Sequence, residues 1–122
     1  MPITVAWDDP DQTITHVTFT GVINLEDLFD AWTHEARLQQ DRSQPVYSLN
    51  NFDPFQVVSS KIRVMDLVTF IKANIPPNLQ MTVQVAADPV TRHSLMFVAR
   101  FMPHEVHIVS TMEAAYTIID QH

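Results

Sequence analysis

The sequence contains no cysteine and a single glycine among its 122 residues. Without cysteine the chain has no disulfide framework, no thiol nucleophile and no thiolate ligand for a metal, which suits the reducing cytoplasm. Gly-rich loops that bind a dinucleotide or a phosphate need several positions without a Cβ, so a single glycine argues against them. The sequence therefore predicts a cytoplasmic protein without a cofactor.

Basic residues are also scarce. Seven lysines and arginines stand against fourteen aspartates and glutamates, which gives a formal net charge of -7. The basic residues form no run, so the protein would repel a phosphate backbone rather than bind it. The sequence lacks the run of about 18 apolar residues that a membrane-spanning helix needs, and its N-terminus lacks the pattern of a signal peptide. We therefore expect no nucleic-acid binding, no secretion and no membrane span.

The chain does contain a regular alternation of strand and helix patterns. Short β-branched or alternating runs predict five strands, at residues 3–7, 13–20, 46–49, 81–86 and 106–109. Apolar residues at helical spacing predict four helices, at about residues 25–39, 59–74, 89–102 and 112–119. Asn24, Asp88 and Thr111 are the expected N-caps for three of these helices.

The order of these elements, β-β-α-β-α-β-α-β-α, is typical of the α/β class. It predicts a mixed, mostly parallel sheet with an N-terminal antiparallel hairpin and helices packed on it. Hydrophobic residues make up 46% of the chain, an ordinary share for a globular protein. Because no linker or repeat divides the sequence, we expect residues 1–122 to form a single domain.

Polar residues gather where the third predicted strand ends and the next helix begins. They are Asn50, Asn51, Asp53, Ser59 and Ser60. Open α/β sheets bind ligands at the carboxyl ends of their strands. Alternatively, the asparagines make a turn and a serine caps the helix. No base is tied to these residues by sequence, so an enzyme acting on a small molecule at residues 50–60 stays a second hypothesis.

Histidines offer two weaker candidates. His104 and His107 are three residues apart across a loop and a strand, whereas a helical zinc pair needs a spacing of four, so the sequence predicts no metal site. Arg92 and His93 lie in the first turns of the third predicted helix, where the helix N-terminus favours an anion. Surface exposure is the alternative for this pair.

The second and third predicted helices each carry a second apolar stripe, although a helix on a sheet needs only one. The extra residues include Ile62, Met65, Phe97 and Phe101. Either neighbouring helices bury these stripes, or they form a groove for a small apolar ligand or a surface for a protein partner. We expect a homodimer with Phe97 and Phe101 as anchors, because buried aromatic residues dominate interface energies.

Several motifs taken together resemble a known family. They are the opening hairpin, Gly21 followed by NLEDL at residues 24–28, Asn50 at the end of a strand, a Ser-Ser helix start, AADP at residues 86–89 and VHIVSTMEAA at residues 106–115. This pattern spans nearly the whole chain and resembles the SpoIIAA-like branch of the STAS domains. The resemblance implies a non-catalytic regulatory module that binds a protein partner or a lipid-like ligand.

The resemblance also implies a phosphorylation site in those relatives that act as anti-sigma-factor antagonists. Their Asp-Ser-Ser-Gly motif falls here on Val58, Ser59, Ser60 and Lys61, and their strand-ending aspartate falls on Asn50. Only the serines match. The sequence therefore favours a helix cap at Ser59 or Ser60, with a phosphorylated switch at Ser59 as the alternative.

Overall fold

The computed structural model describes residues 3–57 and 64–122, without the side chains of residues 25, 53–57, 64 and 67. The described strands are β1 (Ile3–Trp7), β2 (Ile14–Ile23), β3 (Val46–Val57), β4 (Leu79–Ala86) and β5 (Glu105–Val109). The described helices are α1 (Leu25–Gln40), α2 (Val64–Asn74), α3 (Pro89–Ala99) and α4 (Met112–Asp120). Their order confirms the sequence prediction.

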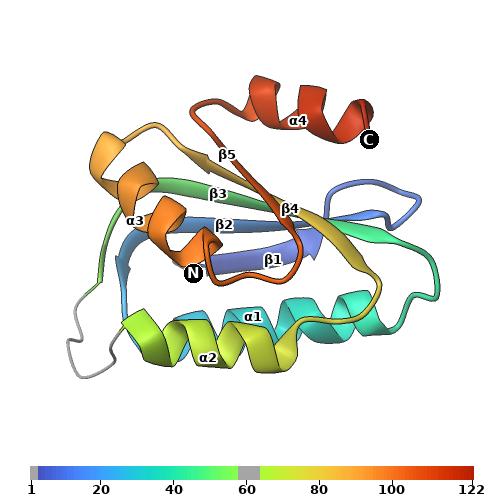
Figure 1. The fold of residues 1–122 in the computed structure, drawn as a ribbon, viewed down its shortest axis with the longest axis horizontal. Helices are drawn as coiled ribbons and strands as arrows, with labels where there is room; N and C mark the ends of the chain where they lie inside the picture. The colour runs from blue at the N-terminus through green and yellow to red at the C-terminus, as the bar shows by residue number, and fades with distance from the viewer. Residues whose placement is uncertain (1–2, 58–63) are drawn as a thin grey trace.

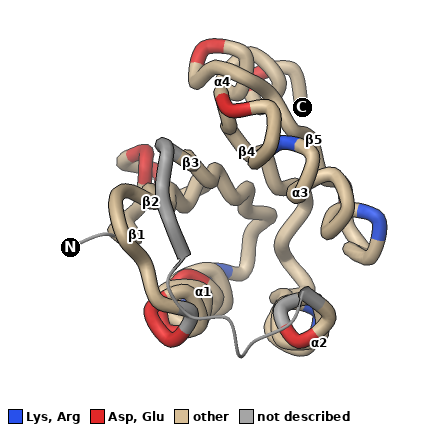
Figure 2. The backbone as a smooth tube through the Cα atoms, turned by 90° about the vertical axis from the view of Figure 1, so that its left-hand side faces the viewer, with Lys and Arg blue, Asp and Glu red and all other residues tan. Residues whose placement is uncertain are grey.

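The strands form a single five-stranded sheet in the order β1-β2-β3-β4-β5. β1 pairs with β2 in antiparallel fashion, and the remaining neighbours are parallel. Each parallel connection steps one strand further across the sheet through α1, α2 or α3, and right-handed crossovers of this kind place their helices on one face. Figures 1 and 2 show α1 and α2 on that face and α4 on the other.

The two faces of the sheet have separate apolar cores. On the α1 face, buried residues of β1 and β2 pack against the helix and against Phe52, whose ring stacks on Phe19 with centroids 4.5 Å apart. On the α4 face, Leu49, Met81 and Val83 pack against Ala115 and Ile119 of the helix. Buried polar residues, among them Thr15, Ser48 and Asn50, adjoin the first core.

β3 is longer than the sequence predicts, and this changes the position of Asn50. The prediction ended the strand at residue 49, before a run that closes with Pro54, a residue type that normally interrupts a sheet. The β3–β4 pairing runs only to Phe52, and beyond it β3 continues along β2 to Val57. A proline is tolerated where a strand has one neighbour, so the predicted strand end was wrong and Asn50 lies within the strand.

β2 also extends beyond its prediction. It continues to Ile23 through Gly21, where the register with β3 shifts and φ is 69°. A positive φ is strained for residues with a side chain, which explains the glycine at this bulge. α3 ends at Ala99, a few residues earlier than predicted. α2 is described from Val64, and the predicted start of that helix lies outside the described residues.

The three predicted N-caps are confirmed. The side chain of Asn24 accepts a hydrogen bond from the backbone N–H of Asp27 at 2.9 Å. Asp88 accepts from the backbone N–H of Thr91 at 3.0 Å, and Thr111 accepts from that of Ala114 at 3.1 Å. The predicted cap at Ser59 or Ser60 lies outside the described residues.

Asp8 joins α4 to the hairpin on the far side of the sheet. Its carboxylate accepts hydrogen bonds from the Tyr116 hydroxyl at 2.9 and 3.1 Å, and its Oδ1 lies 3.1 Å from Nδ1 of His16. Burial, together with the hydrogen bond to Asp8 and its charge, raises the pKa of Tyr116 to about 12. The contact spans 108 positions of sequence and fixes the last helix to the first turn.

We expect Tyr116→Phe to lower the free energy of unfolding by about 1 kcal/mol at neutral pH, because it removes a hydrogen bond to a carboxylate. The wild type should also lose stability between about pH 10 and pH 12, since the unfolded chain releases the tyrosine proton first. The variant should lack that loss. Urea melts across this pH range measure both effects, with Tyr47→Phe as the matched control. An equal loss in the two variants would contradict this account.

Candidate functional site

A cavity of about 90 Å³ lies between the sheet and the three helices of the α1 face. Its walls are mainly apolar and come from different elements, with Trp32 on α1, Phe70 on α2 and Val98 on α3. Met102, just after α3, also lines it. Val98, Ala99 and Met102, which lie within the third predicted helix, therefore border this cavity.

Polar side chains of β3 and β4 form the floor of the cavity. Ser48 on β3 is the register partner of Thr82 on β4, and Asn50 is the partner of Gln84. Residues two apart in a strand point to the same face, so these four side chains form a square on one face of the sheet. All four line the cavity, and we call them the polar floor.

Glu35 of α1 is buried against one side of the polar floor. Its Oε2 accepts hydrogen bonds from the hydroxyls of Thr15 at 2.7 Å and Ser48 at 2.5 Å. Gln39, one helical turn later, donates from Nε2 to Thr15 Oγ1 at 2.9 Å. Thr15 is also the register partner of Ser48. The network thus links α1 to β2 and β3.

Burial raises the pKa of Glu35, although the hydrogen bonds from Ser48 and Thr15 act in the opposite direction. Desolvation dominates because the ionised form loses its hydration while both donors are neutral hydroxyls. Since both hydroxyls donate to Oε2, a proton held by Glu35 would sit on Oε1. The polar floor therefore adjoins a carboxyl group that holds its proton more readily than an exposed one.

His104 borders the opposite side of the polar floor. Its Nε2 lies 2.7 Å from the hydroxyl of Thr82, and burial lowers its pKa. The other ring nitrogen, Nδ1, is buried without a hydrogen-bond partner among the described residues. The imidazole is therefore favoured in its neutral form, with one ring nitrogen free for a ligand.

Two more atoms of the polar floor lack partners in the described part of the chain. They are Asn50 Oδ1 and Gln84 Oε1, and both are buried. A buried polar atom without a partner costs free energy, and most such atoms in native proteins are hydrogen-bonded to protein, water or ligand. Their presence in one small cavity is typical of a binding site.

The site contains hydroxyls beside an acid and a base, but it does not form a catalytic triad. In a hydrolase, the base that activates the hydroxyl is itself oriented by a third group. Here Nδ1 of His104, the histidine beside Thr82, has no hydrogen-bond partner among the described residues. The Ser48 hydroxyl donates a hydrogen bond to Glu35, and this contact holds α1 against the sheet. The geometry supports hydrogen bonding to a ligand better than nucleophilic attack.

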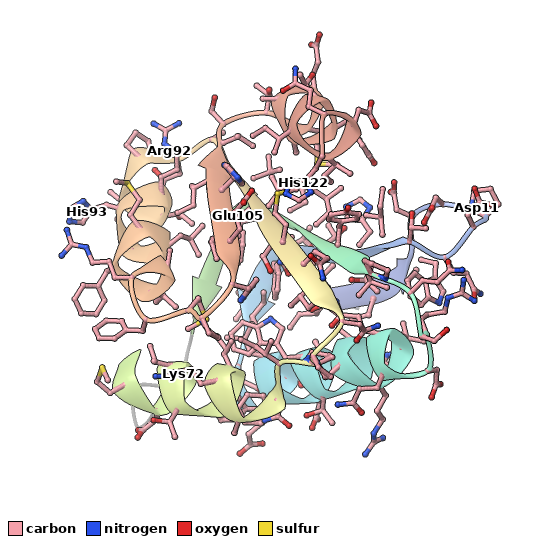
Figure 3. All side chains as sticks on the ribbon, turned by 45° about the vertical axis from the view of Figure 1, so that its right-hand side comes forward. Asp11, Lys72, Arg92, His93, Glu105 and His122 are labelled. Carbon is pink, nitrogen blue, oxygen red and sulfur yellow. The ribbon has the colours of Figure 1, made fainter. Side chains whose placement is uncertain are left out.

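The predicted histidine pair is separated in the structure. His104 contacts Thr82 in the cavity, whereas Nε2 of His107 lies 2.6 Å from Glu105 at a partly exposed site. Over residues 3–57 and 64–122, no group of three or more histidine, aspartate or glutamate side chains is arranged to hold a metal ion. Arg92 and His93 project outward from α3 (Figure 3) and do not line the cavity.

The structure brings Asn50 into the cavity but not the other predicted polar candidates that it describes. Asn51 follows it in β3 and is therefore on the α4 face, paired with Val85. Asp53 lies in β3, with its side chain outside the description. Ser59, Ser60 and Ile62 also lie outside the described residues.

The predicted apolar candidates lie on the surface. Met65 on α2 is 49% exposed, and Phe97 on α3 is 45% exposed. Phe101, just after α3, is 36% exposed. None of these three lines the cavity. The alternative that neighbouring helices bury the second apolar stripes is therefore wrong for Met65, Phe97 and Phe101.

Sequence reasoning missed most of the site, namely Glu35, Gln39, Ser48, Thr82 and Gln84. It considered His104 only as a metal ligand and not as part of a cavity. A signal was present in the helix, because Trp32, Glu35 and Gln39 follow the same spacing as its core residues. A second signal lay in β4, where Thr82 and Gln84 alternate with valines. A parallel strand covered by helices on both faces is normally apolar throughout, so these polar residues needed an explanation.

Comparison with known proteins agrees with this architecture. A search of protein-family models found no match, and a search of curated proteins found none either. Among solved structures, the chain is similar to an uncharacterized protein of the DUF3478 family from Shewanella loihica PV-4, which has a SpoIIAA-like fold. The TM-score is 0.64 at 13% sequence identity, over 95% of this chain and 90% of the other.

This chain has a SpoIIAA-like fold. The predicted resemblance and the predicted mixed α/β sheet are both confirmed. A sequence identity of 13% is informative about the fold alone and not about a ligand, a partner or an activity. No described helix has the length and apolar character needed to cross a membrane.

Burial of Glu35 should make the free energy of unfolding depend on pH. The folded protein holds the Glu35 proton at pH values where the unfolded chain has lost it, so stability should fall as the pH rises above the usual carboxyl pKa of about 4.3. Glu35→Gln keeps the shape and cannot ionise. We expect it to abolish this part of the decline, as measured by urea melts between about pH 4 and pH 8.

Glu26→Gln, at an exposed position in the first turn of the same helix, is the control and should leave the profile as in the wild type. Parallel pH profiles for Glu35→Gln and the wild type would show that Glu35 ionises normally in the folded protein.

Proposed function

We propose that this domain binds a small, partly apolar molecule in the cavity between the polar floor and α1, α2 and α3, without catalysing a reaction. The observation that carries the proposal is the set of three buried, unpaired polar atoms on Asn50, Gln84 and His104. They lie beneath apolar walls, which is the usual composition of a small-molecule site. A ligand would supply the missing hydrogen bonds while its apolar part contacts the walls.

The size of the cavity restricts the ligand. An engineered protein cavity of about 150 Å³ admits benzene, and the present cavity is smaller, at about 90 Å³. A whole lipid does not fit in this volume. A lipid-like ligand, as the family resemblance implies, would enter with one end only. The proposal therefore favours a small molecule or the polar end of a larger one.

Binding is favoured over catalysis by the arrangement of the titratable groups. Glu35 and His104 both line the cavity, but each contacts a different hydroxyl of the polar floor. Acid-base catalysis would require an acid or base within reach of the same reacting atom. Enzymatic activity at the polar floor is the alternative, and it would gain support from turnover that is lost in His104→Ala.

Filling the cavity tests the binding proposal. Ala99 of α3 lines the cavity, and Ala73 of α2 is exposed. We expect Ala99→Phe to lose any small molecule that co-purifies with the wild type, because its ring occupies the apolar space. Ala73→Phe adds the same ring on the surface and should retain the molecule. Native mass spectrometry of freshly purified protein compares the bound masses. An unchanged bound mass in Ala99→Phe would count against this site.

A second proposal, self-association, is supported by the outer surface of α3. No residue of α3 is buried. Val90 is 74% exposed and Met96 is 58% exposed. The rings of Phe97 and Phe101 contact each other with centroids 5.4 Å apart. Exposed apolar residues commonly mark protein interfaces where they form a patch, and a second copy of the chain is the occupant that we expect at Phe97 and Phe101.

Charge substitution tests self-association. Combining Phe97→Glu with Phe101→Glu should convert a dimer into a monomer, because it places two carboxylates in an apolar contact. Val22→Glu, at a 59% exposed position on β2, is the control and should keep the wild-type state. Analytical ultracentrifugation at micromolar concentration measures the mass. A wild type that sediments as a monomer would refute the proposal.

The switch at Ser59 is a separate alternative. It rests on the family resemblance, since Ser59 lies outside the described residues. Phosphopeptide mass spectrometry of protein from its native host distinguishes it from a helix cap. Phosphate on Ser59, together with an unchanged melting curve for Ser59→Ala, would favour the switch.

A further inference from the structure

Two buried hydrogen-bond acceptors of the polar floor lack a donor among the described residues. Asn50 is only 5% exposed, and its Nδ2 donates to Ser48 Oγ at 3.1 Å. Because Ser48 donates its own proton to Glu35, it accepts from Asn50, and this fixes the orientation of the Asn50 amide. Its Oδ1 is left without a partner, as is Oε1 of the neighbouring Gln84. Two carbonyl oxygens on adjacent strands therefore lack donors.

No described lysine or arginine side chain lines this cavity. Lys72 lies on α2 and Arg92 on the outer side of α3 (Figure 3), and neither belongs to the cavity. His104 is favoured in its neutral form by burial, which lowers its pKa. An anionic ligand group would thus be buried beside two carbonyl oxygens without a described cation, which is strongly unfavourable.

We propose that the cavity selects an uncharged ligand group that donates hydrogen bonds to Asn50 Oδ1 and Gln84 Oε1, a primary carboxamide being the simplest, over a carboxylate of the same shape. This inference rests on the proposed binding function and specifies the class of its ligand. Asn50 and Gln84 are register partners on adjacent strands, which lie about 4.8 Å apart, and in the proposed complex one –NH₂ group donates to both oxygens. The apolar walls contact the attached chain.

Butanamide and butanoate are the probes for this selection. They have the same shape and chain length, and at about pH 7 only butanoate is charged. Titrations of the ¹⁵N-labelled protein, followed by NMR at the side-chain amides of Asn50 and Gln84, measure both affinities. We expect butanamide to bind with a Kd on the order of 10 mM or tighter. Butanoate should bind at least about tenfold more weakly, because it cannot donate.

A matched pair of variants locates the selectivity. Gln84→Met removes one acceptor while keeping an unbranched chain, and it should reduce the preference for butanamide by roughly tenfold. Gln80→Met makes the same change at an exposed position of β4 and should keep the preference. Thermal melts of both variants verify that they are folded.

The outcomes separate the inference from the function on which it rests. Equal affinity for the two probes, or tighter binding of butanoate, would overturn the selection of an uncharged donor and leave binding in the cavity intact. If neither probe shifts the Asn50 and Gln84 signals, or if Ala99→Phe binds butanamide like the wild type, the proposed function fails as well.

Discussion

The α1 face of this domain depends on the burial of the Glu35 carboxyl group. A buried acid is tolerated only when its oxygens are hydrogen-bonded or its proton is retained. Here Thr15 and Ser48 supply the donors from two adjacent strands, so the helix and the sheet have one defined relative position. Because the Ser48 hydroxyl donates its hydrogen bond to Glu35, it can only accept one from Asn50, and this sets the orientation of the Asn50 amide. The orientation of the Asn50 amide in the cavity thus follows from one buried carboxyl group.

The two faces of the sheet differ in the residues that the helices cover. The α4 face is a close-packed apolar core around Leu49 and Val83, and its helix is held at the edge by Tyr116 and Asp8. The opposite face carries the polar floor, and there α1, α2 and α3 leave a cavity beside the apolar core around Phe19 and Phe52. Polar residues in a central parallel strand reduce apolar burial. Their presence at four neighbouring positions favours the proposed ligand over a purely structural role.

The sequence was sufficient to predict the fold, because its information is local. Caps at Asn24, Asp88 and Thr111 and the alternation of periods fix the elements, and β-α-β order fixes a parallel sheet. The site was only partly predictable. Asn50 was chosen because it was expected to end a strand, although it lies within one. The pairing of Asn50 with Gln84 depends on strand register, which no local pattern in the sequence specifies.

The central claim is that the polar floor faces a cavity in which its acceptors are left for a ligand. A crystal structure of the purified protein, at a resolution that shows ordered water, tests this directly. The account predicts electron density for a small molecule or ordered water within hydrogen-bond distance of Asn50 Oδ1 and Gln84 Oε1. A closed cavity, with both oxygens hydrogen-bonded to groups of the protein itself, would contradict it.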